Sequence, residues 1–311
     1  MLGAAAPRGG VVLIPTVLLL VGGIAYGSMF SANKFAVEAG LPVMAYAFWQ
    51  SLFASVLLLG ASFATRRPPR VDLKSLRLFV VVAAMGLVGP LVVFASVADR
   101  VPPGVLTLIV ALIPATTYVL SLSLRMDRLR WLSVAGVTLG FGGILLIVLP
   151  SGSLPTPEAA IWVVFALLVP VFAAINNVFG ERLAVPGVAT TALAGGMFTV
   201  ATVLLFIAMM ATDGLVLLTD AGLSGVYAVL WATAAQTITY GCFFEIIRRA
   251  GGLFFAIINY VVVAAGLIWA NLLFGEHLSL WVWGAVVLVA LSLVLMNIGT
   301  VRGVRESAAR G

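Results

Sequence analysis

Long runs of apolar residues, broken by short polar turns, make up almost the whole chain. A helix needs about 20 mostly apolar residues to cross the hydrocarbon core of a bilayer, and in lipid a helix satisfies its own backbone hydrogen bonds. Ten runs meet this requirement, at residues 12–32, 42–64, 77–97, 103–124, 131–149, 159–180, 188–211, 223–246, 252–273 and 280–299. The turns between them are too short for a sizeable soluble domain. The pattern therefore predicts an all-α membrane protein with ten transmembrane helices.

The composition agrees with this interpretation. Of the 311 residues, 63% are hydrophobic and only 9% are charged, whereas soluble domains are about 45–50% apolar and about 25% charged. The net charge is +6, but the basic residues are spread over short loops and not clustered on one face, so we expect no nucleic-acid partner.

The basic residues give the predicted helices a direction. Ten crossings place both termini on one side, and fifteen of the 17 lysines and arginines then fall on that side. The other side holds Lys34 and Arg100. Because cytoplasmic loops carry the excess of Lys and Arg, we expect both termini in the cytoplasm and the protein in the cytoplasmic (inner) membrane of a bacterium.

The turn-rich stretch 150–158 divides the predicted helices into two groups of five. We therefore expect a first repeat over 1–149, a linker over 150–158, a second repeat over 159–299 and a cytoplasmic tail over 300–311. An odd number of helices in each half means that the second repeat enters the membrane from the opposite side, as in inverted-repeat transporters. At an offset of 149 the halves align Arg100 with Arg249, Leu124 with Leu273, Asp127 with Glu276 and Leu129 with Leu278.

The end of the second half resembles a known family. Asn259-Tyr-Val-Val-Val263, then Trp269 to Leu278 with the pair Gly275-Glu276, and Gly284 in the next run resemble the penultimate helix, Gly-Glu turn and last helix of the ten-helix EamA-type branch of the drug/metabolite transporter (DMT) superfamily. The first half departs from that pattern, because Met126-Asp127 replaces Gly-Glu, although Pro114 sits where the family often has proline. The resemblance covers nearly the whole chain. It implies an exporter of amino acids, aromatic ones included, or of related small metabolites.

Polar and aromatic side chains at membrane depth are the candidate substrate-binding residues, because polar groups are costly in lipid. They are Tyr26, Ser28, Trp49, Gln50, Asn176, Asn177, Gln236, Tyr240, Asn259 and Tyr260. Amide groups with aromatic faces suit a neutral or zwitterionic solute. Each has an alternative role: Asn and Gln also bridge helices, and Trp and Tyr near helix ends also anchor them at the interface.

Three prolines lie within the predicted helices, at Pro90, Pro114 and Pro170. Each removes a backbone hydrogen bond and is expected to kink its helix. We treat them as candidate hinges for a rocking motion between inward-open and outward-open states.

The energy source is indicated by what the sequence lacks. It contains no Walker-type phosphate loop, and Glu38, Asp99, Glu181 and Glu245 fall near the ends of predicted helices and not at mid-membrane. This favours facilitated transport over proton-coupled transport, although Glu245 is a candidate coupling acid, with ion pairing to Arg248 or Arg249 as its alternative.

Several function classes compete with an amino-acid exporter. A nucleotide-sugar or sugar-phosphate transporter calls for Lys or Arg at depth, of which the runs hold essentially none; a drug transporter of the same superfamily is a further alternative. An intramembrane protease needs a histidine at depth, but His277 is the single histidine and lies in a turn. We expect no enzyme activity, cofactor or metal, a small-molecule substrate and the lipid bilayer as partners, and a monomer.

Overall fold

The structure is a computed structural model that describes residues 13–69, 72–150, 154, 156–183, 190–255, 257–276 and 278–308. Within these residues the regular structure is helical. The α-helices of the first half are α1 (Leu13–Glu38), α2 (Val43–Ala64), α3 (Leu73–Ala83), α4 (Gly89–Val97), α5 (Pro103–Val110), α6 (Ile113–Ser123) and α7 (Trp131–Val148), with a π-helical turn η1 (Ala84–Val88) between α3 and α4. Those of the second half are α8 (Ala159–Ala166), α9 (Leu168–Arg182), α10 (Thr190–Thr212), α11 (Gly222–Phe255), α12 (Ile258–Phe274) and α13 (Leu280–Ala308), with a 3₁₀ turn η2 (Leu218–Ala221) before α11.

Eight helical segments in the described chain are long and apolar enough to cross a membrane, and three of them combine shorter helices across a break: α3 with α4, α5 with α6, and α8 with α9. The shorter α12 is also apolar. The long α11 does not belong to these eight, and it carries polar residues such as Thr233, Gln236 and Thr239 along its length. The protein is therefore a helical membrane protein, while the count of ten crossings stays a prediction.

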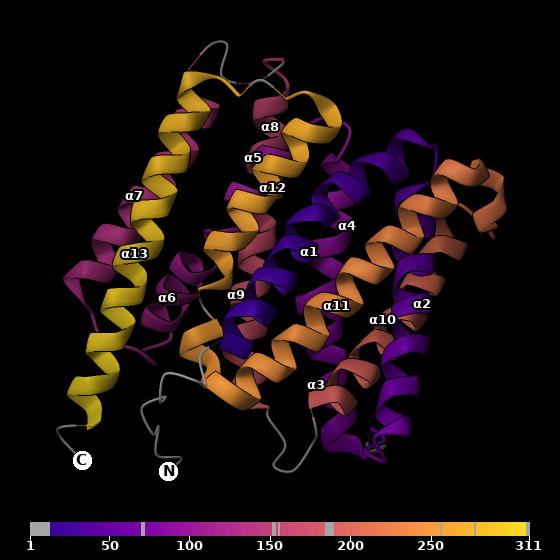
Figure 1. Ribbon diagram of the computed structural model, residues 1–311, viewed down its shortest axis with the longest axis horizontal. Coiled ribbons are helices and arrows are strands. Elements are labelled where there is room, and N and C mark those ends of the chain that lie inside the picture. Colours follow the sequence, from indigo (N-terminus) through magenta and orange to yellow (C-terminus); the bar gives the residue numbers. More distant parts are fainter. Residues whose placement is uncertain are drawn as a thin grey trace.

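The helices pair across the two halves of the sequence. Helix α1 packs along α11 and α12, α2 along α10, and α7 along α13. In Figure 1 the α7–α13 pair forms one edge of the molecule and the α2–α10 pair the opposite edge, with α1, α11 and α12 between them. The start of α1 and the end of α13 lie towards the same end of the molecule.

Glycines allow the closest of these approaches. A Cβ added to Gly27 of α1 would lie 2.8 Å from the backbone nitrogen of Gly266 and 2.9 Å from the carbonyl oxygen of Val262, both on α12. Small residues at such crossings let backbones pack closely, which is a main source of helix association in lipid. Many large apolar side chains, such as Val56 and Leu272, face outward from the bundle, where the acyl chains of a bilayer would cover them.

One predicted turn is helical instead. The sequence pattern suggested a break over 247–251, but α11 continues to Phe255. Glu245 forms ion pairs with both Arg248 and Arg249, at 2.5 Å each, three and four residues further along. Pairs at this spacing lie on one helix face and stabilise the helix. These ion pairs are the structural role that the sequence offered for Glu245 as an alternative to proton coupling.

Candidate functional site

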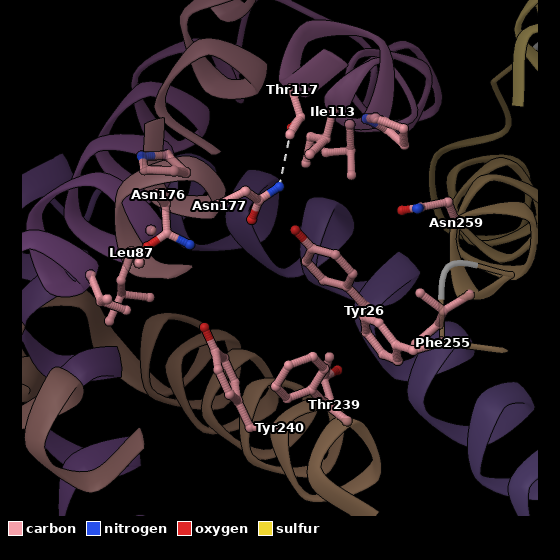
Figure 2. Close-up of a pocket in the computed structure, with 18 of the residues that line it drawn as sticks. Tyr26, Leu87, Ile113, Thr117, Asn176, Asn177, Thr239, Tyr240, Phe255 and Asn259 are labelled. Atoms are coloured by element: carbon pink, nitrogen blue, oxygen red, sulfur yellow. Dashed lines mark hydrogen bonds between the residues drawn. The ribbon is translucent and has the colours of Figure 1, made fainter. Parts of the chain in front are cut away.

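A cavity of about 890 Å³ lies in the centre of the bundle. Its wall draws side chains from both halves of the chain, including α1, α4 and α6 of the first half and α9, α11 and α12 of the second. Its size falls within the range of small-molecule sites. Figure 2 shows Tyr26, Asn177 and Asn259 facing the same open space from three different helices.

The cavity reaches one end of the molecule and stops short of the other. Towards the end where α1 begins and α13 finishes, its lining includes Asp127 and Arg130 of the α6–α7 turn and Thr300 of α13. In the opposite direction the described lining goes no further along α1 than Asn33, or along α4 than Phe94. The described lining thus extends to the α6–α7 turn at one end, and on α1 and α4 it stops before the far ends of these helices.

Six of the ten candidate residues lie in the cavity wall: Tyr26, Asn176, Asn177, Gln236, Tyr240 and Asn259. The Asn177 side-chain amide donates a hydrogen bond to Thr117 Oγ1 at 3.1 Å, shown as the dashed line in Figure 2. The Tyr240 ring packs edge-on against Phe198, with ring centroids 5.3 Å apart. The wall therefore combines amides with aromatic rings, and the roles of these residues in binding stay predictions.

The other four candidates lie outside the described lining. Ser28 donates to the Ala25 carbonyl oxygen at 2.7 Å and accepts from Trp231 Nε1 at 3.0 Å. Trp49 Nε1 donates to the Val216 carbonyl oxygen at 3.0 Å, and Gln50 is 1% exposed within the bundle.

Tyr260 is the fourth of these residues, and its hydroxyl accepts from Asn297 Nδ2 at 3.1 Å. The hydrogen bonds of Ser28 with Trp231, of Trp49 with Val216 and of Tyr260 with Asn297 each link two parts of the protein. Such contacts correspond to the helix-bridging alternative.

All three candidate hinge prolines adjoin a helix break. Pro90 follows the π-helical turn η1, Pro114 is the second residue of α6 after α5 ends at Val110, and Pro170 is the third residue of α9 after α8 ends at Ala166. Since proline has no N–H for the carbonyl four residues earlier and its ring crowds that carbonyl, a break on its N-terminal side is the expected response. Pro90 and Pro114 line the cavity, whereas Pro170 does not belong to the described lining.

The charged side chains in the described lining are those of Asp127 and Arg130, and they are paired. Their carboxylate oxygen and guanidinium nitrogen lie 2.5 Å apart. The Arg130 guanidinium also lies 5.2 Å from the centroid of the Tyr118 ring, and the Tyr118 hydroxyl accepts from the Arg130 backbone N–H at 2.8 Å. Because the two charges cancel, the described wall of the cavity carries no net charge.

A second ion pair lies at the far end of the molecule. Lys34 of α1 lies 3.9 Å from Glu276 of the α12–α13 turn, with the side chains 19% and 11% exposed. The backbone N–H of Gly104, in α5, donates to the other Glu276 oxygen at 3.4 Å, and the Lys34 ammonium lies 4.2 Å from the centroid of the Phe274 ring. Burial raises the pKa of Glu276, while the Gly104 N–H and Lys34 act in the opposite direction.

Sequence reasoning missed several residues of the site. Thr117 and Thr239 line the cavity. They gave no clear signal in the sequence, because threonine hydroxyls are common in membrane helices, where they bond to the preceding turn. Asn33 also lines it and accepts a hydrogen bond from the Tyr46 hydroxyl. The polar residues Asn33 and Lys34 were the available signal, but they lay just beyond the predicted end of the first helix at residue 32. His277 lies outside the described residues, and among those residues no group of three potential ligands could hold a metal ion.

These features define a class of protein: a helical membrane protein whose two halves together enclose a central cavity. The sequence profile of the EamA-like transporter family matches the chain twice, over residues 13–149 and 160–298. The chain belongs to the EamA-like transporter family, a branch of the DMT superfamily, which is a family of transporters and not of enzymes.

One solved structure supports the fold. The crystal structure of a protein is similar to this chain with a TM-score of 0.61 and 19% sequence identity. The match covers 94% of this chain and 99% of that one. At that identity the likeness concerns the fold alone. No curated protein matches the chain in sequence.

Proposed function

We propose that the protein is a secondary transporter that exports small zwitterionic metabolites, in particular amino acids with aromatic or other apolar side chains. The observation that carries this proposal is a central cavity walled by amides and aromatic rings whose charged residues are paired with each other. A nucleotide sugar or sugar phosphate calls for unpaired cations around its phosphates, and a neutral wall of this kind suits a zwitterion better.

The transport mechanism proposed is facilitated alternating access. The one-sided opening of the cavity and the ion pair at the far end are the features that support it. Lys34 and Glu276 hold α1 against the α12–α13 turn in this state, and the three proline-linked breaks supply points where helices can bend. Export then requires the far end to open as the hollow end closes.

We also propose that the chain crosses the membrane ten times as two inverted five-helix repeats, with both termini in the cytoplasm of a bacterium, acting as a monomer. The pairing of helices supports an internal two-fold relation. Helix α1 packs on α11 and α12, while α9, in the second half, packs on α4 and α6 of the first half. The basic Arg66 and Arg125 follow α2 and α6, and Arg248 lies near the end of α11. These three helices finish towards the end of the molecule where α1 begins, as the positive-inside rule requires.

The test is transport by the purified protein in proteoliposomes. We expect saturable counterflow of labelled L-phenylalanine and other apolar amino acids, without dependence on a pH gradient, and no transport of UDP-sugars. Absence of saturable transport for every amino acid in the panel would refute the substrate class. Strict dependence on a proton gradient would refute facilitation while leaving the substrate class intact.

A further inference from the structure

Three aromatic rings of the cavity wall contact one another in a row. Tyr240, Phe243 and Phe255 all belong to α11, line the cavity and are half-buried. The ring centroids of Tyr240 and Phe243 lie 6.3 Å apart, and those of Phe243 and Phe255 lie 4.6 Å apart. These distances place the three rings in one continuous group, which we call the ring cluster.

The end of α11 turns back to complete the ring cluster. In a straight helix, the positions of Phe243 and Phe255 would lie about 18 Å apart along the axis. Two extended phenylalanine side chains could not shorten that distance to a centroid separation of 4.6 Å. The bend brings Phe255, the last residue of the helix, against a ring about three turns earlier. Figure 2 shows Phe255 and Tyr240 beside the same open space.

The rings of the cluster meet at steep angles. The plane of the Phe243 ring is inclined by 77° to that of Phe255 and by 72° to that of Tyr240. The Tyr240 ring also packs edge-on against Phe198 of α10, which is 0% exposed and lies outside the described lining. A fully buried ring thus supports Tyr240 within the protein, and the cluster borders the cavity.

Nearly perpendicular rings form a corner that suits another planar ring. The face of an aromatic ring is negative and its edge positive, so aromatic pairs prefer offset-stacked or edge-to-face arrangements. A ring that enters such a corner can contact one wall with its face and the other with its edge. A saturated ring fills a similar volume but has no such charge distribution, so it gains only from burial. Tyr26 faces the same space from α1.

We infer that Tyr240, Phe243 and Phe255 form a subsite for a planar aromatic ring of the transported solute. This inference rests on the proposed function and narrows it, because the protein then selects for aromatic rings over aliphatic groups of similar size. The ring cluster sets this selectivity, which is separate from the recognition of the solute's polar groups.

The pair of Phe48 and Phe206 provides a matched control. These two rings also contact each other, with centroids 5.5 Å apart. They belong to α2 and α10, at the edge of the bundle in Figure 1, and both lie outside the described lining of the cavity. Phe206→Leu therefore removes the same kind of ring contact without changing the cavity wall.

The experiment measures binding to the purified full-length protein with three pairs of probes that differ only in the saturation of the ring. The pairs are L-phenylalanine with L-cyclohexylalanine, 2-phenylethylamine with 2-cyclohexylethylamine, and 3-phenylpropionate with 3-cyclohexylpropionate. In every pair that binds, we expect the phenyl compound to bind at least about threefold more tightly. Phe243→Leu and Phe255→Leu should each reduce this preference to less than about twofold, whereas Phe206→Leu should leave it unchanged.

The ratio within a pair separates a subsite from a structural role, because a variant that only loosens the fold weakens both members equally. A wall that recognises apolar surface alone would favour the larger, more apolar saturated ring. That result, binding of none of the probes, or an equal effect of Phe206→Leu would each overturn the subsite.

A Phe243→Leu protein that fails to fold would be recognised by size-exclusion chromatography, and Phe255→Leu then decides. The proposed function fails separately. If the amine or the acid pair shows the expected preference but no amino acid is transported, the ring subsite stands and the amino-acid substrate does not.

Discussion

At the scale of single residues, the close approach of Gly86 to Asn176 leads to a prediction for a substitution at position 86. A methyl group at position 86 would meet Asn176 Oδ1 at 2.7 Å, so Gly86→Ala should turn the amide away from its present position. We expect the KM for L-phenylalanine to rise about tenfold, the scale of one hydrogen bond to a charged group. The measurement is counterflow in proteoliposomes.

The control for this substitution is Gly60→Ala, since an added Cβ at Gly60 has nothing within 4 Å. Gly60 lies in α2, where alanine also has the better helix propensity. An unchanged KM in Gly86→Ala would contradict the role of Asn176.

Positions along a helix can be counted from the sequence, but the rotation of each residue about the helix axis could not be predicted. Gln50 and Gln236 were selected by the same depth argument, yet only Gln236 lines the cavity. Depth follows from counting residues at a fixed rise. Facing depends on which neighbours a helix packs against, and helices that are apolar on all sides carry little periodic signal.

At the scale of helices, the crossing of α1 and α12 is tightly constrained by backbone atoms. The space beside Gly27 is closed by backbone atoms of Gly266 and Val262, which cannot move aside as a side chain can. Gly27→Ala should therefore separate the helices and destabilise the protein by about 1–3 kcal/mol, the usual cost of overpacking. The measurement is the thermal unfolding midpoint in detergent.

Gly142→Ala in α7 is the comparison, because its added Cβ would find its nearest atom, Leu288 Cδ1, at 3.9 Å. We expect its unfolding midpoint to stay close to that of the wild type. Equal midpoints for the two variants would show that α1 and α12 can move apart without cost.

Helix positions were predictable from apolar runs, and the errors occurred where another force set the boundary. The first predicted helix ended at residue 32, but α1 continues to Glu38, through the polar run that includes Asn33 and Lys34. These side chains are accommodated by partners from elsewhere in the chain, Tyr46 and Glu276. Hydropathy cannot anticipate partners that only the tertiary fold supplies.

At the scale of the whole molecule, the ion pair between Lys34 and Glu276 links α1 to the α12–α13 turn, at the end that is closed in our proposed mechanism. Removing the cation should loosen this end, because it leaves a mostly buried carboxylate without a countercharge. We expect Lys34→Ala to speed amide hydrogen exchange at least about fivefold in the first turn of α5 and in the α12–α13 turn. Glu276→Gln should disturb these amides less, since glutamine can still accept from the Gly104 N–H.

The sign of the pH effect follows from the raised pKa of Glu276. Burial favours the protonated carboxyl, so the closed end binds a proton more tightly than an open, solvated one would. Closure should therefore be strongest below the ordinary pKa of 4.5 and weaken as pH rises through the raised value. In Lys34→Ala the exchange rates, corrected for intrinsic pH dependence, should fall on acidification; a rise would contradict this assignment.

The two turns aligned by the 149-residue offset differ in their partners. Asp127 in the first half pairs with Arg130 of its own turn, whereas Glu276 in the second half pairs with Lys34 of α1. The sequence predicted two acidic turns in equivalent places. Which cation each acid meets follows from the neighbours that the fold places beside its turn, and the sequence pattern alone did not indicate them.

The pairing of Asp127 with Arg130 has a consequence for the membrane potential. A single uncompensated charge that crosses the membrane exchanges about 2.3 kcal/mol with the field for every 100 mV. The described cavity wall is neutral, and a zwitterion adds no net charge to it. Under the proposed mechanism, a cavity loaded with a zwitterion would move no net charge, so the membrane voltage would neither drive nor oppose transport. The solute's own concentration difference would then set the direction.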